Sequence, residues 1–364
     1  MFEHLVINHV GTLPTPFELL QAHPRSPAQK KFVENQRNQI KNILNGDDKR
    51  LLVIVGPCSI HDITAAKEYA TKLLQLSRSI EDTCCVVMRV YFEKPRTARG
   101  WKGFLYDPAL NETYDIASGL RLGRQLLSDL ATLGIATAAE FLDPLSSYYF
   151  SDLVSWGCIG ARTTSSQTHR QMASGLPMPI AFKNTTDGNV EAAVNGIICA
   201  GLSHTYIGMD LHGRISTIRT QGNSNGHIVL RGSNSGSNYD PESVSQALSL
   251  LCKADLPQRL LIDCSHDNSF RQHQEQLSVF KSVFNQVAEG NSNIRGVLLE
   301  SNLFAGNQPF VSGPAQLKYA VSITDPCLDW ATTERLLLWG DARLKQRRSS
   351  KAFQPSTITV NSYN

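Results

Sequence analysis

Short apolar runs alternate with longer amphipathic stretches along most of the chain. Eight of the runs are almost continuously apolar, which is typical of parallel strands that are buried on both faces. They are Leu51–Val55, Cys85–Val90, Ile135–Phe141, Val154–Ala161, Pro179–Phe182, His227–Leu230, Arg259–Asp263 and Gly296–Leu299. Between and after them, apolar residues recur at helical spacing in Ile63–Leu76, Val190–Ala200, Ser243–Ala254, Glu275–Ala288 and Thr332–Lys345.

This alternation predicts an α/β protein, a closed (β/α)8 TIM barrel, with an open doubly wound sheet as the weaker alternative. The segment Thr205–Asn225 is rich in Ile, Thr and Gly, which predicts a β-hairpin inserted before the sixth strand.

The first fifty residues have a different pattern. Phe17–Ala22 predicts a short helix and Arg25–Asn45 a polar, amphipathic one. Such an extension has too little apolar surface to fold alone, so we expect it to pack on the barrel or on a neighbouring subunit. The expected domains are an N-terminal extension (1–50), a catalytic barrel (51–350) and a C-terminal tail (351–364).

Composition narrows the class of protein. The 364 residues are 41% hydrophobic and 18% charged, and the net charge of +3 is too small to indicate a nucleic acid or an anionic membrane as partner. We find no signal peptide and no apolar stretch of roughly 18 residues, and the eight scattered cysteines are typical of reduced thiols, so we expect a cytoplasmic protein. We interpret the basic run Arg343–Lys351 as a solvated helix end rather than a binding site.

Charged residues follow the apolar runs. In a barrel, the carboxyl ends of all strands meet at one mouth, where catalytic groups are found. A mouth with this many cations predicts anionic ligands, and two phosphorylated substrates, one of them also a carboxylate, would use the whole set. For any single arginine the plainer interpretation is a surface salt bridge. The cations are Arg89, Lys94, Arg96, Arg162, Lys183 and Arg231.

A second set at the same strand ends consists of Cys58, His266, Glu300 and Asp325. One thiolate, one imidazole and two carboxylates would suit a divalent transition metal, and manganese, iron, cobalt and zinc all remain open. Taken singly, Cys58 is better interpreted as a small buried residue and His266 as a satisfied core histidine, and only their meeting with Glu300 and Asp325 at the strand ends favours a metal.

Seven motifs resemble the type I 3-deoxy-D-arabino-heptulosonate 7-phosphate (DAHP) synthases, in the feedback-regulated bacterial and fungal branch. The resemblance runs in order from about Leu13 to Trp330. The motifs are Gly56-Pro-Cys-Ser-Ile-His-Asp62, Met88-Arg-Val-Tyr-Phe-Glu-Lys-Pro-Arg-Thr97, Gly160-Ala-Arg-Thr-Thr164, Ala181-Phe-Lys-Asn184, Asp263-Cys-Ser-His266, Gly296-Val-Leu-Leu-Glu-Ser301 and Ser322-Ile-Thr-Asp325.

The resemblance implies an aldol-type condensation of phosphoenolpyruvate with erythrose 4-phosphate, the first step of aromatic biosynthesis through the shikimate and chorismate pathway. It implies metal ligands at the four residues of the second set and a phosphate site for erythrose 4-phosphate at Arg96 and Thr97. Lys94 would assist the reacting aldehyde oxygen, and the bound metal would act on it as a Lewis acid. Phosphoenolpyruvate would be bound by Arg89, Lys94, Glu140, Arg162, Lys183 and Arg231. The resemblance also suggests a homo-oligomer, either a dimer or a tetramer.

Several positions depart from the family pattern. Where the family binds aromatic amino acids for feedback, this chain has Ser147, Tyr148 and Pro177, so we predict weak or absent feedback. Other departures are Ser165, Thr185, Leu211, Ser233, Ser237 and Asn302. The alternatives are a relative that uses another aldose phosphate such as arabinose 5-phosphate, a catalytically lapsed paralogue, and a class II metal aldolase. The last leaves the surplus of cations unexplained.

Overall fold

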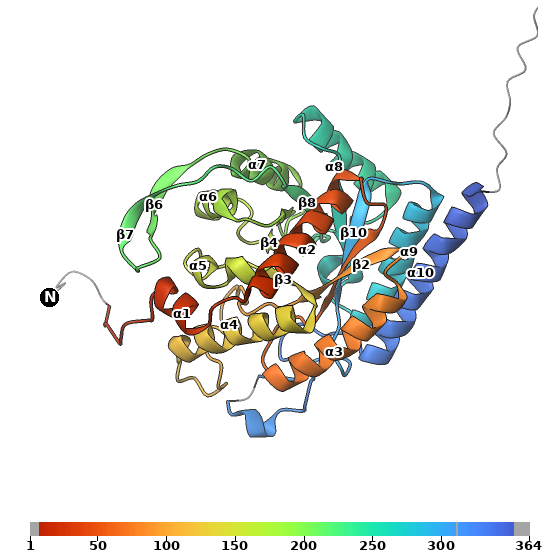
Figure 1. Ribbon diagram of the computed structural model, residues 1–364. Helices are drawn as coiled ribbons and strands as arrows, with labels where there is room; N and C mark the ends of the chain where they lie inside the picture. The colour runs from red at the N-terminus through yellow and green to blue at the C-terminus, as the bar shows by residue number, and fades with distance from the viewer. Residues whose placement is uncertain (1–6, 311, 353–364) are drawn as a thin grey trace, which may run out of the picture.

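Each predicted strand pairs in parallel with its neighbours, and the last strand pairs with the first. The computed structural model describes residues 7–310 and 312–352, and its eight-stranded sheet closes in the order β1-β10-β9-β8-β5-β4-β3-β2 (Figure 1). Closure confirms the TIM barrel and excludes the doubly wound sheet. The barrel strands are β1 (Leu51–Gly56), β2 (Cys84–Arg89), β3 (Ala136–Glu140), β4 (Trp156–Ile159), β5 (Ile180–Lys183), β8 (His227–Leu230), β9 (Leu260–Asp263) and β10 (Ile294–Glu300).

A helix follows every barrel strand. Side chains cap several of these helices, as when Asp62 accepts a hydrogen bond of 3.0 Å from the amide of Ala65 at the start of the first. The helices are α3 (Ile63–Ser79), α4 (Ile116–Leu133), α5 (Ser147–Phe150) with the 3-10 turn η1 (Ser151–Leu153), α6 (Gln167–Gly175), α7 (Glu191–Ala200), α8 (Pro241–Lys253), α9 (Gln276–Glu289) and α10 (Trp330–Ala352). The tail from residue 353 onward lies outside the described residues.

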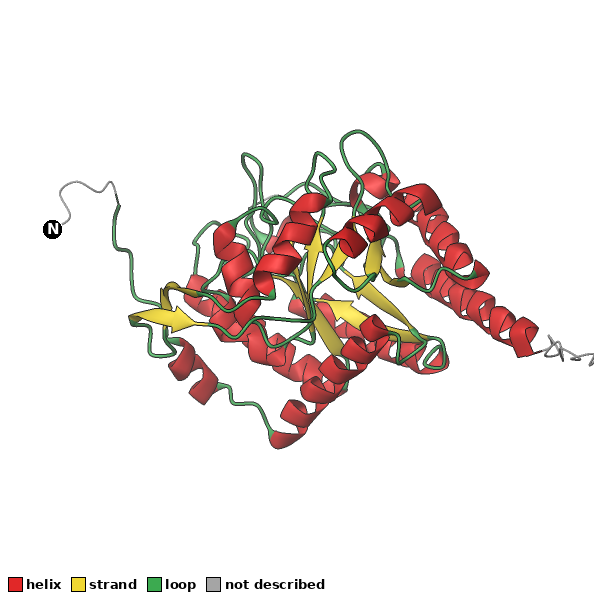
Figure 2. Cartoon of the chain, turned by 90° about the horizontal axis from the view of Figure 1, so that it is seen from above, coloured by secondary structure: helices red, strands yellow, loops and turns green. Residues whose placement is uncertain are grey.

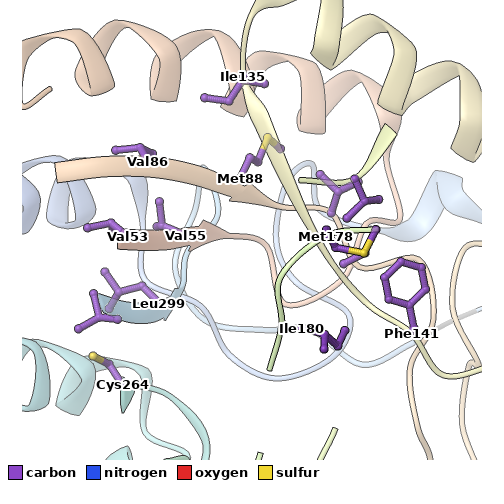
Figure 3. Close-up of a cluster of buried hydrophobic side chains, with 14 of the residues drawn as sticks. Val53, Val55, Val86, Met88, Ile135, Phe141, Met178, Ile180, Cys264 and Leu299 are labelled. Carbon is purple, nitrogen blue, oxygen red and sulfur yellow. The ribbon is translucent and has the colours of Figure 1, made fainter. Parts of the chain in front are cut away.

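Alternate residues of each strand face opposite sides of the sheet, and both sides are buried. Outward-facing side chains pack between the sheet and the helices, where Figure 3 shows Val53 and Val55 of β1 beside Val86 and Met88 of β2. Inward-facing residues form a separate core cluster inside the barrel, with members from every strand. Double-sided burial explains why the strands are continuously apolar in sequence.

The amino end of the barrel is closed by helix α2 (Pro27–Asn45). Its Ile40, Ile43 and Leu44 are buried in the same cluster as the inward-facing residues of the strands. Arg37 ties the helix to the wall by donating hydrogen bonds to the carbonyl oxygen of Val154 at 2.8 and 3.0 Å. The extension therefore packs on the barrel, as expected of a segment without a core of its own.

The predicted hairpin is present before β8, the sixth strand of the barrel. Strands β6 (Thr205–Met209) and β7 (Ile215–Arg219) pair antiparallel and project from the side of the barrel (Figure 2). The short helix α1 (Pro16–Ala22) joins the hairpin at its tip, where the amide of Phe17 donates to Leu211 O at 2.8 Å. None of the described helices combines the length and apolar character needed to cross a membrane.

Candidate active site

A cavity of about 290 Å³ opens at the carboxyl ends of the barrel strands. Most of the predicted substrate residues line it, together with two predicted metal ligands, His266 and Asp325. Arg89, Cys58 and Glu300 are buried and do not line the cavity. The predicted residues that line it are Lys94, Arg96, Thr97, Glu140, Arg162, Lys183, Arg231, His266 and Asp325.

Three of the predicted cations are paired with carboxylates. Arg89 Nη2 lies 3.0 Å from Glu300 Oε1, and Lys183 Nζ lies 2.9 Å from Asp263 Oδ2. Arg231 pairs with Asp267. Sequence reasoning assigned no role to Asp263 or Asp267, because neither an ion pair nor its partner can be read from one strand end alone. The fully buried Arg89 also has a terminal nitrogen, Nη1, that meets no hydrogen-bond acceptor in the described part of the chain.

The outer part of the cavity has cations without carboxylate partners. Over residues 7–310 and 312–352, no carboxylate lies within 4.0 Å of Arg96 or Arg162. Arg162 Nε contacts Thr97 Oγ1 at 3.4 Å, and Arg96 Nε donates to Trp101 O at 2.8 Å. Sequence reasoning missed two further cations of the lining, Arg99 and Arg271, of which Arg271 pairs with Asp267 at 3.0 Å. The arrangement leaves positive charge at the entrance for an anionic ligand.

Three predicted metal ligands converge beneath the cavity. The ligand atoms of Cys58, Glu300 and Asp325 all lie within 4.8 Å of one another. Burial, reinforced by the charge of Glu300, raises the pKa of the Cys58 thiol to about 12. A thiol and two carboxylates held this close disfavour a thiolate unless a cation joins them, so the donor set fits a divalent transition metal.

The fourth predicted ligand, His266, is held by a neighbouring carboxylate. Its Nε2 lies 3.8 Å from Glu300 Oε1, and its Nδ1 lies 2.9 Å from Asp263 Oδ2. A carboxylate at the second ring nitrogen orients metal-binding histidines in many proteins. The backbone of His266 has a φ of +56°, a left-handed conformation that is uncommon for residues other than glycine and that clusters at functional sites.

Lys94 links the cation set to the metal cluster. Its Nζ donates to Cys58 Sγ at 3.1 Å and to the carbonyl oxygen of Cys58 at 3.2 Å. Burial lowers the pKa of Lys94, but its interactions with Cys58 and with the carboxylates of Glu300 and Asp325 outweigh burial and raise it above the usual value. Lys94 is therefore an ammonium at neutral pH, placed to donate to an oxygen bound at the cluster.

Glycine is required where β4 ends. A Cβ atom on Gly160 would lie 2.2 Å from Glu140 Oε1, so any other residue would displace the carboxylate from the cavity. The close approach of the Glu140 carboxylate to the backbone therefore requires glycine at position 160.

A second cavity of about 580 Å³ lies between α5, α6 and the hairpin. The three predicted regulatory positions, Ser147, Tyr148 and Pro177, all line it. The Tyr148 hydroxyl lies close to β6, where a Cβ atom on Gly208 would be 3.2 Å from it, so its ring spans part of the space between the helix and the hairpin.

Comparison with known proteins identifies the family. The DAHP synthetase I family matches residues 28–338. The chain belongs to the DAHP synthetase I family.

Curated relatives match the chain over nearly all of its length. The Trp-sensitive phospho-2-dehydro-3-deoxyheptonate aldolase of Shigella flexneri is 47% identical over 90% of this chain and 94% of its own. A phospho-2-dehydro-3-deoxyheptonate aldolase of Corynebacterium glutamicum is 45% identical over 93% of both chains. The solved structure of the Francisella tularensis SCHU S4 enzyme has a TM-score of 0.91 and 44% identity, covering 94% of this chain and 99% of that one.

The departures from the family pattern lie outside the mouth. Ser165, Thr185, Ser233 and Asn302 do not line the 290 Å³ cavity, and Leu211 lies at the hairpin tip. The departures thus leave the residue types that line the described mouth unchanged.

A buried glutamate supports the loops around the mouth. Glu93 accepts hydrogen bonds from Ser146 Oγ at 2.8 Å and from the amide of Asp143 at 3.0 Å, although it precedes Lys94 on a different loop. Burial is the largest cause that raises the pKa of Glu93, to about 7, and the hydrogen bonds offset it only in part.

The raised pKa of Glu93 predicts a pH-dependent loss of stability. Because the unfolded chain releases this proton at lower pH than the folded one, the folded state loses stability as pH rises from about 4.5 to 7, by up to about 3 kcal/mol. Glu93→Gln does not titrate. We therefore expect the stability of the wild type, relative to that of Glu93→Gln, to fall between pH 5 and pH 8, measured by urea unfolding. Glu34→Gln, on the exposed face of α2, is the control, and an unchanged difference for Glu93→Gln would contradict the assignment.

Proposed function

We propose that this chain is a 3-deoxy-7-phosphoheptulonate synthase that condenses phosphoenolpyruvate with erythrose 4-phosphate and water to give DAHP and phosphate. The observation that carries the proposal is the mouth itself. Paired cations lie beside the metal-ligand cluster, and unpaired cations lie at the entrance, on a chain that belongs to the DAHP synthetase I family. The reaction is the first step of the shikimate pathway.

The deeper cations, joined by Arg162 from the outer part of the cavity, bind phosphoenolpyruvate. Arg162, Lys183 and Arg231 hold its phosphate, and Arg89 and Lys94 hold its carboxylate, with Glu140 beside them. Two features support this division. Lys183 and Arg231 are fixed by their ion pairs with Asp263 and Asp267, and Arg89 has a buried nitrogen without a protein acceptor. Fixed donors of this kind stabilise the phosphate as its bond to carbon breaks.

The outer cations bind erythrose 4-phosphate. Arg96 and Thr97 hold its phosphate, and support comes from the absence of a carboxylate partner on Arg96 within the described residues and from the contact between Thr97 and Arg162. This places the aldehyde toward the floor of the cavity. Lys94 then donates a hydrogen bond, or its proton, to the aldehyde oxygen as the new carbon–carbon bond forms. Water adds at C2, and phosphate leaves with cleavage of the C–O bond.

Cys58, His266, Glu300 and Asp325 would hold a divalent metal ion, of which manganese, iron, cobalt and zinc are candidates. A metal bound there supplies Lewis-acid polarisation of the aldehyde. The chain's own contribution is to hold the ligands in place. Asp263 orients His266, and Ser265 Oγ donates to Glu300 Oε2 at 2.7 Å.

The condensation is tested by phosphate release from the two substrates. We expect release to need both substrates and a divalent metal and to stop with a chelator. Cys58→Ala should lower the rate about 100-fold or more because one metal ligand is lost. Cys252→Ala, an exposed cysteine on α8, is the matched control and should keep the wild-type rate.

Two outcomes would contradict this proposal. Faster release with arabinose 5-phosphate than with erythrose 4-phosphate would favour the relative with another aldose phosphate. No release with any of the four metals would favour the lapsed paralogue, although the described site retains every predicted ligand and cation.

We further propose that aromatic amino acids inhibit this enzyme weakly or not at all, unlike the relatives named Trp-sensitive and Tyr-sensitive. The Tyr148 side chain lines the second cavity and reaches from α5 to the hairpin beside Gly208. We expect phenylalanine, tyrosine and tryptophan at physiological concentrations to change the rate less than about twofold. The triple variant Ser147→Pro, Tyr148→Gln, Pro177→Ser, which restores the family pattern, should gain inhibition. Strong inhibition of the wild type would refute the prediction.

We propose a homo-oligomer, either a dimer or a tetramer, and a cytoplasmic location, the latter from the scattered positions of the eight cysteines in the sequence. The hairpin supports association, because Ile207 and Ile215 are each 85% exposed on its outer face. In sedimentation experiments we expect Ile207→Lys with Ile215→Lys to shift the mass toward that of one chain. Thr71→Lys, at an exposed polar position on α3, away from the hairpin, is the control. A wild type that sediments as a single chain at micromolar concentration would disprove association.

A further inference from the structure

A third cavity, of about 450 Å³, lies at the amino end of the barrel, opposite the mouth. It is bounded by the start of β1, the start of β10, the end of α9 and the side of α10. Because β1 and β10 run parallel, this cavity is separated from the metal-ligand cluster by the length of both strands. It belongs neither to the active site nor to the regulatory cavity beside the hairpin.

The lining of this cavity has two parts. Its apolar side chains are Leu51, Val287, Ile294 and Leu344, all of them buried. Its charged side chains are all cations, and among the described residues no aspartate or glutamate lines the space. These cations are Lys49, Arg50, Arg295 and Arg347.

The four cations differ in how many hydrogen bonds and ion pairs they form with the protein. Arg50 pairs with Asp48 at 2.6 Å, and Lys49 donates to Gly46 O at 2.5 Å. Arg347 belongs to the basic run that we interpreted as a solvated helix end, but it lines this cavity and donates to Val287 O. That interpretation is therefore incomplete.

Arg295 is the least satisfied of the four. Its Nε is buried and meets no acceptor in the described chain. Its guanidinium packs against Gly46, where a Cβ atom would lie 2.6 Å from Nη2. Burial lowers the pKa of Arg259, and the charge of Arg295 lowers it further, so positive charge accumulates at this end of the barrel. Asp47 offsets the charge of Arg295 only in part, because burial still leaves the pKa of Arg295 lowered.

We propose that this cavity is a binding site for an organic anion with an apolar body, of the class of aromatic carboxylates. The carboxylate would meet Arg295 and Arg347, and the ring would lie on Leu51, Ile294 and Leu344. A bare inorganic anion would leave that apolar surface unmatched, and a neutral ring would leave Arg295 unpaired. The volume accommodates one or two fused rings. This site is independent of the proposed condensation.

The test is calorimetric titration of naphthalene-2-carboxylate into the full-length protein in the presence of saturating phosphoenolpyruvate, which occupies the mouth. We expect binding to persist under these conditions. The neutral 2-naphthamide should bind at least tenfold more weakly. Arg295→Met should also weaken binding at least tenfold, whereas Arg335→Met, an exposed arginine of α10 outside the cavity, should leave it unchanged.

Ser292→Trp provides a second variant, because Ser292 is exposed and lines the cavity, so a bulky ring there obstructs the space without entering the core. It should also weaken binding at least tenfold. Condensation activity of each variant reports that it is folded. Displacement of the naphthoate by phosphoenolpyruvate, or equal affinity of the wild type and both cavity variants, would overturn the proposal.

Discussion

Closure of the parallel sheet is the constraint on which the active site depends. Once β10 pairs with β1, every strand presents alternate residues to one shared interior and ends at one shared mouth. Six of the eight strands follow the same plan, in which an inward apolar residue is followed two positions later by a charged one. In β1 and β4 the second residue is a glycine instead. Val87 precedes Arg89, Ala138 precedes Glu140, and Ala181 precedes Lys183. Because side chains alternate along a strand, the same inward face provides both the apolar core of the barrel and the charged floor of the site.

Burying so many charges is possible because the interior pairs them. An unpaired buried ion costs several kcal/mol, and breaking a buried pair costs about 3–5 kcal/mol. Lys183 and His266 share Asp263, while Arg89 and His266 approach Glu300. The charges of His266 and Lys183 hold the pKa of Asp263 well below its usual range, although burial alone would raise it. The result is a rigid set of donors, which favours transition-state stabilisation over flexible ligand capture.

The fold was predictable from sequence because its signal is local, whereas much of the site depends on contacts between distant residues. Each strand appears as its own apolar run, and the hairpin as its own Ile-, Thr- and Gly-rich segment. The helices α4, α5 and α6 were not predicted, although the apolar residues of α4 recur at helical spacing. The positions at the strand ends were also predictable. The partners of these residues were not predictable, because they depend on how the loops pack. Examples are the ion pairs of Asp267 with Arg231 and Arg271 and the hydrogen bond between Glu93 and Ser146.

The role of the N-terminal helix α2 was also not predictable from its own sequence. Its sequence indicates a polar helix, and only the barrel explains why Ile40, Ile43 and Leu44 are apolar. Each such side chain contributes about 1.5–3 kcal/mol when fully buried, so the three together contribute about as much as the whole net stability of a typical domain. Without α2, the inward residues at the amino end, such as Leu52 and Trp156, would face water. The helix that the sequence sets apart is therefore part of the core, and the catalytic mouth at the other end depends on it.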